Sequence, residues 1–253
     1  MIDLFTEASQ GRKILLKSLV GSCNYNLNIE NSDKDYKVFV APTFEDLYDS
    51  HIYCKSYSSD EVDFEVHDIR RLEVLLYQSN INFLEVFFSD DIGLSISSKH
   101  ATNAYLSDIL KLKNDIATVN LPYLYHSSMG MSIKNHSSIQ IGTKNTLNLI
   151  EKFGYNTKKA LCSYRTVDFL ERFANNGFSD FKAAISYDGK DREKMLEIRD
   201  GRYSLDEFSY MLQRKHEFVD RELKPLYKGH EVNKKLLFDV RSMIKRIVSV
   251  EMD

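Results

Sequence analysis

The chain has 253 residues and a formal net charge of −3, with 43% hydrophobic and 28% charged residues. This balance is typical of a soluble globular protein, long enough for one large domain or two small ones. No apolar run approaches the ~20 residues of a membrane-spanning helix. Residues 1–7 lack the basic region and apolar core of a secretion signal, so we expect a protein that is neither exported nor held in a membrane.

The three cysteines, Cys23, Cys54 and Cys162, lie far apart and show no metal-binding spacing. An odd number of isolated cysteines favours free thiols in a reducing compartment. The sequence therefore predicts a cytoplasmic protein without disulfides.

The first 90 residues alternate between short helical and extended patterns. In chain order they predict a short helix, a strand at 13–20, a turn at Gly21-Ser22, a strand at 35–41 closed by Pro42, a strand at 61–67, a helix at 68–79 and an apolar segment at 83–88. Residues 60–66 alternate acidic and apolar side chains, which is the period of a half-buried strand.

After Asp90-Asp91 the pattern becomes helical, with apolar residues three and four positions apart. The expected helices are 104–117, 123–133, 146–152, 157–174, 204–225 and 231–250. Ser204 followed by Glu207 has the spacing of a capping box at a helix start. We therefore predict an α+β protein in two parts, residues 1–90 with a small mixed sheet and residues 91–253 with helices.

The formal charge is distributed unevenly, with −6 over residues 1–150 and +3 over residues 151–253. A polyanionic partner would therefore prefer residues 151–253.

Two carboxylates stand where the second strand begins. Asp33 and Asp35 are two residues apart, and on an extended segment such residues point to the same side. Paired carboxylate oxygens suit Mg²⁺ or Mn²⁺, which are bound by one or two carboxylates together with substrate phosphates. Asp33 and Asp35 are therefore our candidate metal ligands.

The turn before them is suited to an anion. Gly21 lets the backbone approach a ligand closely, and the neighbouring N–H groups with the Ser22 hydroxyl are able to hold phosphate oxygens. A phosphate-binding turn after one strand and two metal-binding carboxylates at the start of the next indicate nucleotidyl transfer from a nucleoside triphosphate.

This arrangement resembles the polymerase-beta-type nucleotidyltransferases, whose signature is an apolar residue, Gly-Ser, about ten residues and Asp-x-Asp. The resemblance is strongest to the RNA-repair-associated branch of predicted nucleotidyltransferases, and it extends in order over roughly residues 12–210. The matching blocks are Val20-Gly21-Ser22 with Tyr25 and Leu27, Asn31-Ser32-Asp33-Lys34-Asp35-Tyr36, Asp63 with Asp68-Ile69-Arg70-Arg71-Leu72, Asn80 with Leu84-Glu85-Val86, Lys158 with Ala160 and Arg165, and Ile198-Arg199-Asp200-Gly201-Arg202-Tyr203-Ser204. The chain departs from the family pattern at Lys34, Asn26 and Cys162, where an aromatic or small residue, a glycine and a histidine are usual.

The resemblance implies a third carboxylate on the strand beside Asp33 and Asp35, as catalytic base and further metal ligand. Asp63, Glu65 and Asp68 are the candidates. Asp63 and Glu65 share one face of their strand, so spacing alone does not choose between them. The family block begins its strand at the position of Asp63, which makes Asp63 our choice. Asn80 and Glu85 are candidates to orient ribose or a water.

Lys158, Arg165 and Arg172 are seven residues apart and so return to nearly one face of a predicted helix. Such a basic stripe is often only solvated, but the resemblance implies that Lys158 and Arg165 bind the triphosphate or the phosphates of the acceptor. Arg199, close to a glycine, is explained as well by ordinary helix capping.

The resemblance implies a Mg²⁺-dependent nucleotidyltransferase that moves a nucleoside monophosphate from a triphosphate such as ATP to an acceptor hydroxyl. An RNA end is the expected acceptor. Two other interpretations stay open, namely transfer to a protein or small-molecule hydroxyl, as in toxin-like members, and a non-catalytic nucleotide-binding protein with this fold.

Overall fold

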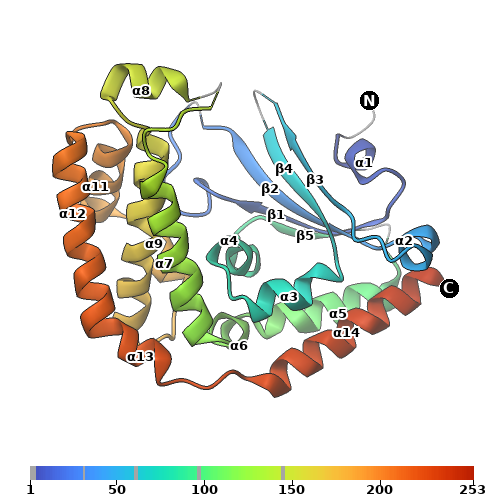
Figure 1. The fold of residues 1–253 in the computed structure, drawn as a ribbon. Helices are drawn as coiled ribbons and strands as arrows, with labels where there is room; N and C mark the ends of the chain where they lie inside the picture. Colours follow the sequence, from blue (N-terminus) through green and yellow to red (C-terminus); the bar gives the residue numbers. More distant parts are fainter. Residues whose placement is uncertain (1–3, 31, 60–61, 96–97, 144–145) are drawn as a thin grey trace. The chain divides into compact units, whose positions relative to one another are not determined.

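The computed structural model describes residues 4–30, 32–59, 62–95, 98–143 and 146–253. Outside the described residues lie Asn31 of the Asp-x-Asp block, Asp60, and Glu61, the first residue of the third predicted strand. The chain forms two compact units, one made of residues 1–119 and 233–253 and the other of residues 120–232 (Figure 1).

The first unit is built on a five-stranded mixed sheet with the order β3-β4-β2-β1-β5. Its strands are β1 Ile14–Val20, β2 Lys34–Val40, β3 Cys54–Ser58, β4 Val62–Asp68 and β5 Ile92–Leu94. The central strands β2 and β4 run parallel, and the other neighbouring pairs are antiparallel. Because β2 and β4 are parallel, both begin at the same edge of the sheet.

Helices cover both faces of this sheet. They are α1 Leu4–Ser9, α2 Phe44–Tyr48, α3 Arg71–Tyr77, α4 Ile81–Leu84, the 3₁₀ turn Glu85–Phe88, α5 His100–Lys111, α6 Lys113–Ala117 and α14 Lys234–Met252. Figure 1 shows α3, α5 and α14 on one face, where α14 packs against α5 and α3, and α1 on the other. Under α1, Ala8 packs with buried Val38, Val40 and Phe64.

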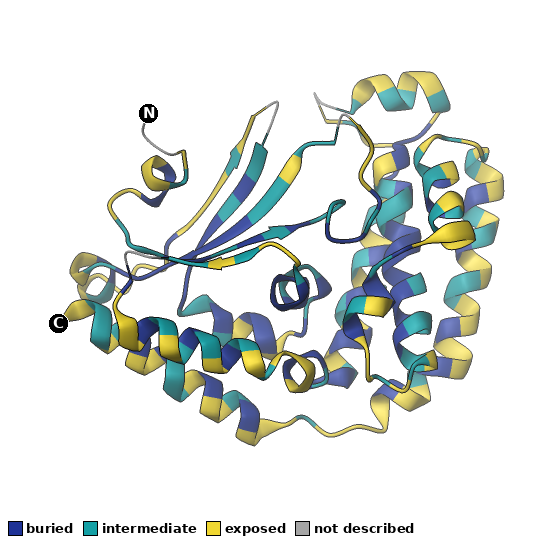
Figure 2. Cartoon of the chain, turned by 180° about the vertical axis from the view of Figure 1, so that it is seen from behind, coloured by how far each residue is buried: buried dark blue, intermediate teal, exposed yellow. Residues whose placement is uncertain are grey.

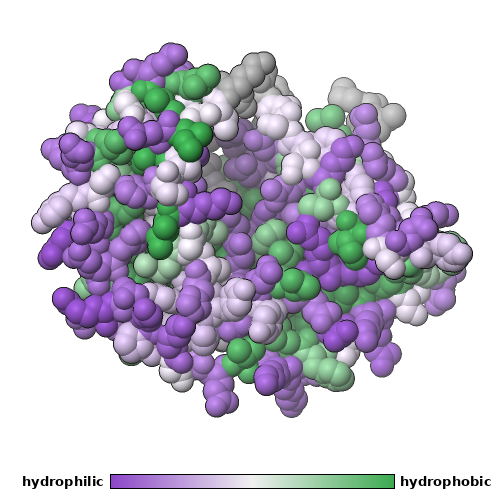
Figure 3. Space-filling model, viewed as in Figure 1, coloured by the Kyte–Doolittle hydropathy of each residue, from purple (hydrophilic) through white to green (hydrophobic). Residues whose placement is uncertain are grey.

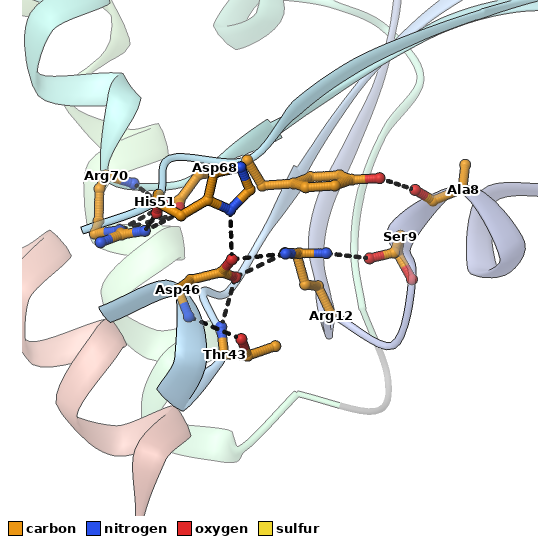
Figure 4. Close-up of polar contacts among 9 residues, drawn as sticks. Ala8, Ser9, Arg12, Thr43, Asp46, His51, Asp68 and Arg70 are labelled. Carbon is orange, nitrogen blue, oxygen red and sulfur yellow. Dashed lines mark hydrogen bonds and ion pairs between the residues drawn. The ribbon is translucent and has the colours of Figure 1, made fainter. Parts of the chain in front are cut away.

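A buried ion pair fixes the segment that leads into β1 (Figure 4). The Asp46 carboxylate, 2% exposed, accepts hydrogen bonds from Arg12 Nε and Nη2 at 2.7 and 2.6 Å, and contacts His51 Nδ1 at 2.8 Å. Asp46 and Thr43 also form a capping box at the start of α2. The Arg12 guanidinium lies 3.8 Å from the centre of the Tyr53 ring and holds the pKa of Asp46 well below its usual range.

We expect Asp46→Ala to lower the free energy of unfolding by about 3 kcal/mol or more near pH 7, because Arg12 would stay buried without its partner. A carboxyl with a depressed folded pKa stabilises the fold above its unfolded pKa, and this contribution is lost as the pH falls through the folded pKa. The difference between variant and wild type should therefore shrink below about pH 4 in urea titrations. Asp49→Asn, at the exposed end of α2, is the matched control and should be nearly silent. An unchanged Asp46→Ala midpoint at pH 7 would contradict the assignment.

The second unit consists of helices packed on the buried helix α9 (Figure 2). They are α7 Leu121–Ser137, α8 Leu147–Phe153, α9 Thr157–Asn175, α10 Phe181–Ile185, α11 Gly189–Arg199, α12 Leu205–Phe218, the π-helical turn Val219–Leu223 and α13 Lys224–Lys228. The π-helical turn lies just before Pro225, which has no N–H to continue a regular helix.

The observed architecture confirms the predicted α+β class, a five-stranded mixed sheet followed by a mostly helical region. The strands at 13–20, 35–41 and 61–67 and the Ser204–Glu207 capping box are also confirmed. The predicted division into a catalytic part, residues 1–90, and a helical substrate-binding or nucleotide-binding part, residues 91–253, stays a prediction. The compact units divide instead at residues 119 and 232, because α14 returns from the chain's end to pack beside α5.

The predicted helix 68–79 starts too early, since Asp68 still pairs with Val40 and α3 begins at Arg71. Strands β3 and β5 and helices α2, α10 and α11 were not predicted. No helix in the described part of the chain is long and apolar enough to cross a membrane. On the face drawn in Figure 3, hydrophilic residues predominate and the hydrophobic ones lie scattered between them.

Candidate functional site: carboxylates at the start of two parallel strands

The register of β2 and β4 brings the predicted carboxylates together. Asp35 lies directly opposite Asp63, at the edge of the sheet where both strands begin. Asp33 precedes β2 by one residue and is partly exposed, as are Asp35 and Asp63. Three oxygen donors are thus gathered at one edge of the sheet by strand pairing alone.

This crowding has an electrostatic consequence. Burial, together with the negative charges of Asp33, Asp63 and Glu85, raises the pKa of Asp35 to about 6. Lys37 acts in the opposite direction and does not offset them. A carboxylate that is this costly to ionise is a place where a cation would be favourable.

Gly21 lies against Asp35. The Gly21 φ of +69° is in the left-handed region, and a Cβ at this position would stand 2.3 Å from Asp35 Oδ2. Only glycine meets both conditions without strain or collision. The Gly-Ser turn predicted from the sequence therefore lies directly against the Asp35 carboxylate.

Glu85 holds this turn from inside the core. Its side chain is 2% exposed and accepts hydrogen bonds from Gly21 N–H at 3.0 Å, the Tyr25 hydroxyl at 2.5 Å and Asn24 Nδ2 at 3.3 Å. Glu85 thus positions the turn rather than facing a ribose. Because Gly21 N–H is bound to Glu85, this amide is not one of those that would grip a phosphate.

The structure separates the three candidates for the third carboxylate. Glu65 Oε2 lies 2.5 Å from Lys37 Nζ and 3.2 Å from His67 Nε2, and the hydrogen bond to His67, followed by the charge of Lys37, lowers the pKa of Glu65 to about 2. Asp68 is fully buried at the far end of β4, where Arg70 binds both of its oxygens (Figure 4). These two carboxylates already have cationic partners.

Asp63 is the candidate that faces Asp35. The Ser58 hydroxyl and the Ser59 N–H both bind Asp63 Oδ1, at 2.6 and 3.2 Å. Neither of these two contacts involves the other oxygen, Oδ2. The register thus sets Asp63 opposite Asp35, whereas Glu65 is paired with Lys37, and the role of Asp63 as third carboxylate stays a prediction.

The carboxylates at this edge are chemically suited to a divalent cation, because they offer only hard oxygen ligands and carry excess negative charge. Among the described residues, no three His, Cys, Asp or Glu side chains already stand at metal-binding distances from one another. Asp33, Asp35 and Asp63 would accordingly have to turn toward a metal as it binds.

The predicted basic stripe of α9 is uneven. Lys158 is exposed in the first turn, whereas Arg165 is 6% exposed and belongs to the buried part of the helix. Arg172 stacks 4.4 Å from the centre of the Tyr187 ring and donates from Nη2 to the Ala183 carbonyl. These side chains do not form one solvated face, and Arg172 has a packing role.

Two residues near the site were not singled out from the sequence. Lys37 neutralises Glu65, and its position two residues after Asp35 on the same strand face was a signal that it belongs here. Asn24 binds Glu85 from within the turn, and no sequence signal pointed to it.

Asn80, a candidate to orient ribose, instead caps α4 by accepting from Asn82 N–H at 2.9 Å.

Comparison of the chain with models of known protein families and with curated proteins finds no match.

We expect Asp35→Asn to be more stable than wild type at pH 8 and equal to it below about pH 4. A carboxyl whose folded pKa is raised loses stability as the pH rises from its unfolded pKa through its folded one, and Asn has no such dependence. Thermal unfolding in EDTA across a pH series measures this. Added Mg²⁺ should stabilise wild type more than the variant. A constant difference at all pH values would contradict the crowding.

Proposed function

We propose that the chain is a polymerase-beta-type nucleotidyltransferase of the RNA-repair-associated branch. The observation that carries the proposal is the register that sets Asp35 opposite Asp63, with Asp33 beside them and Gly21 against Asp35. The sequence resemblance requires these residues to meet in space, and strand pairing across two distant segments brings them together. Transfer to RNA is the form that the resemblance favours.

In this proposal Asp33, Asp35 and Asp63 would hold Mg²⁺ or Mn²⁺. When bound, the metal neutralises phosphate charge and lowers the pKa of the acceptor hydroxyl. Asp63 Oδ2 accepts the proton of that hydroxyl, since Oδ1 is already bound by Ser58 and Ser59. The acceptor oxygen forms a bond to the α-phosphorus of the triphosphate, and the bond to pyrophosphate breaks.

The remaining residues position the reactants. Glu85 fixes the Gly21-Ser22 turn, so the Ser22 hydroxyl is presented to the β and γ phosphates by a rigid backbone. Lys37 keeps Glu65 neutralised, which leaves Asp63 as the base. Lys158 and Arg165 stay predictions as phosphate ligands, and the burial of Arg165 restricts it to a role inside the helical unit.

The direct test incubates the protein with each α-labelled triphosphate, Mg²⁺ and total cellular RNA. We expect label in RNA, and we expect Asp35→Ala to reduce the rate more than tenfold, because a metal ligand acts mainly at the transition state. Label in the protein fraction or in small molecules would redirect the proposal to the toxin-like alternative. No labelled product with any triphosphate, or an Asp35→Ala rate above about a tenth of wild type, would refute the proposed mechanism.

A second prediction separates the two carboxylates of β4. Asp63→Asn should be inactive, because an amide neither takes the proton nor carries the charge. Glu65→Gln should keep most of the activity and lose some stability, since it breaks the pair with Lys37. Initial rates of label transfer and thermal midpoints are measured together. An inactive Glu65→Gln beside an active Asp63→Asn would reverse the assignment.

A further inference from the structure

The thiol of Cys54 lies at an edge of the sheet, with an imidazole directly across from it. Strand β3 is the outermost strand beside β4, and Cys54, its first residue, is exposed. The pairing register sets Cys54 opposite His67, and Cys54 Sγ lies 3.4 Å from His67 Nδ1. A cysteine that is isolated in the sequence is therefore paired with a histidine in the fold.

The imidazole of His67 is buried, and its two nitrogens have different partners. His67 is 3% exposed, and its ring lies 5.7 Å from the Phe39 ring and 5.1 Å from the Phe83 ring. Nε2 lies 3.2 Å from Glu65 Oε2, and Nδ1 lies 3.1 Å from Arg71 Nη1. A guanidinium only donates hydrogen bonds, so Nδ1 carries the lone pair and Nε2–H donates to the Glu65 carboxylate. The nitrogen beside Cys54 is thus the one that accepts a proton.

Cys54, His67 and Glu65 form a connected series of thiol, imidazole and carboxylate. In an activated nucleophile, the attacking group contacts a base, and a third group orients that base in the same order. Burial is the largest influence on His67 and lowers its pKa, although the hydrogen bond with Glu65 opposes this effect. The imidazole is therefore neutral near pH 7 and able to take the thiol proton.

Arg71, in the first turn of α3, adds a positive charge to this cluster. It is partly exposed, and within the described residues its guanidinium contacts His67 and no carboxylate. Arg71 and Cys54 approach the same nitrogen of His67, so the cation stands close to the thiol. A nearby cation favours the thiolate form of a cysteine and attracts an anionic reagent.

We propose that Cys54 is a modification site, where the thiol undergoes exchange with an anionic low-molecular-weight disulfide, for which glutathione disulfide is the probe. Cys54 Sγ attacks one sulfur of the disulfide while its proton moves to His67 Nδ1. A new S–S bond joins Cys54 to one half of the reagent, the original S–S bond breaks, and the departing thiolate takes the proton from His67. Cys54 is oxidised and the departing half is reduced, so a free thiol reverses the reaction. This site does not depend on the proposed transfer.

The test incubates the full chain with glutathione disulfide and follows each cysteine by intact mass and peptide mapping. Cys23 and Cys162, both partly buried, are internal references, and burial raises the pKa of Cys23. The exposed control thiol is the double variant Cys54→Ser with Lys55→Cys, because Lys55 is the next residue of β3, is exposed and points away from the sheet face of His67. We expect Cys54 to react about tenfold faster than this control thiol.

His67→Gln removes the base and keeps a polar side chain. It should slow the modification of Cys54 by about tenfold. Glu65→Gln keeps a hydrogen-bond acceptor at a side chain that is 44% exposed but removes its charge, and it should slow Cys54 by about threefold. A loosened fold would instead speed the reaction of Cys23 and Cys162, so the ratio of the rates separates a missing base from lost structure.

Arg71→Gln tests the choice of reagent. It should slow the reaction of Cys54 with glutathione disulfide more than the reaction with cystamine, a cationic disulfide. Equal slowing with both reagents would overturn the assignment to an anionic disulfide.

Two results would overturn the modification site itself. One is a Cys54 thiol that reacts no faster than the control thiol. The other is an unchanged Cys54 rate in His67→Gln while Cys23 and Cys162 stay slow. If those two thiols become fast in His67→Gln, that variant has lost its fold, and an unchanged Cys54 rate in Glu65→Gln is then the result that overturns the inference.

Discussion

The parallel pairing of β2 and β4 is the constraint on which the candidate site depends. Parallel strands begin at one edge, and this register sets Asp35 against Asp63 and, two residues on, Lys37 against Glu65. The first pair repels and the second attracts. Moving the register by two residues would place Asp35 opposite Glu65. The observed register therefore decides that Glu65 is neutralised by Lys37 and that Asp63 stays available to a cation. The excess negative charge is therefore concentrated at the edge, where a cation can reach it.

A second constraint keeps that edge rigid. Glu85 is buried and binds the backbone of Gly21 together with side chains of the same turn. Gly21 in turn leaves no room beside Asp35 for even a methyl group. A charged group buried in this way is stable only when its hydrogen bonds are satisfied, and a satisfied network fixes one arrangement of the loop. The turn is thus organised before any ligand arrives, which is what electrostatic catalysis requires.

The sequence was informative where patterns were local. Strand β1 is mostly apolar, β2 ends in an apolar run and β4 alternates acidic and apolar side chains, so each strand could be predicted. The Ser204–Glu207 capping box spans only four residues and could be predicted as well. Strand β3 is largely exposed and shows no apolar alternation, which left no signal. The choice between Asp63 and Glu65 depended on a pairing register between distant segments, and both residues share one strand face. The burial of Arg165 could not be predicted either, because seven-residue spacing shows which residues share a helix face but not what packs against that face.

The two units differ in the chemistry that they offer to a phosphate. The carboxylate edge of the sheet repels a triphosphate unless a cation comes with it, because its oxygens already crowd one another enough to raise the pKa of Asp35 to about 6. In the helical unit, by contrast, a pocket at the start of α9 is lined by the cationic side chains of Lys152, Lys158 and Arg199 and by one carboxylate, Asp200. In the proposed function, a triphosphate would therefore bind the sheet unit only together with a divalent cation. This dependence follows from the residues of the sheet unit alone, because crowded carboxylates bind a polyanion only when a cation offsets their charge.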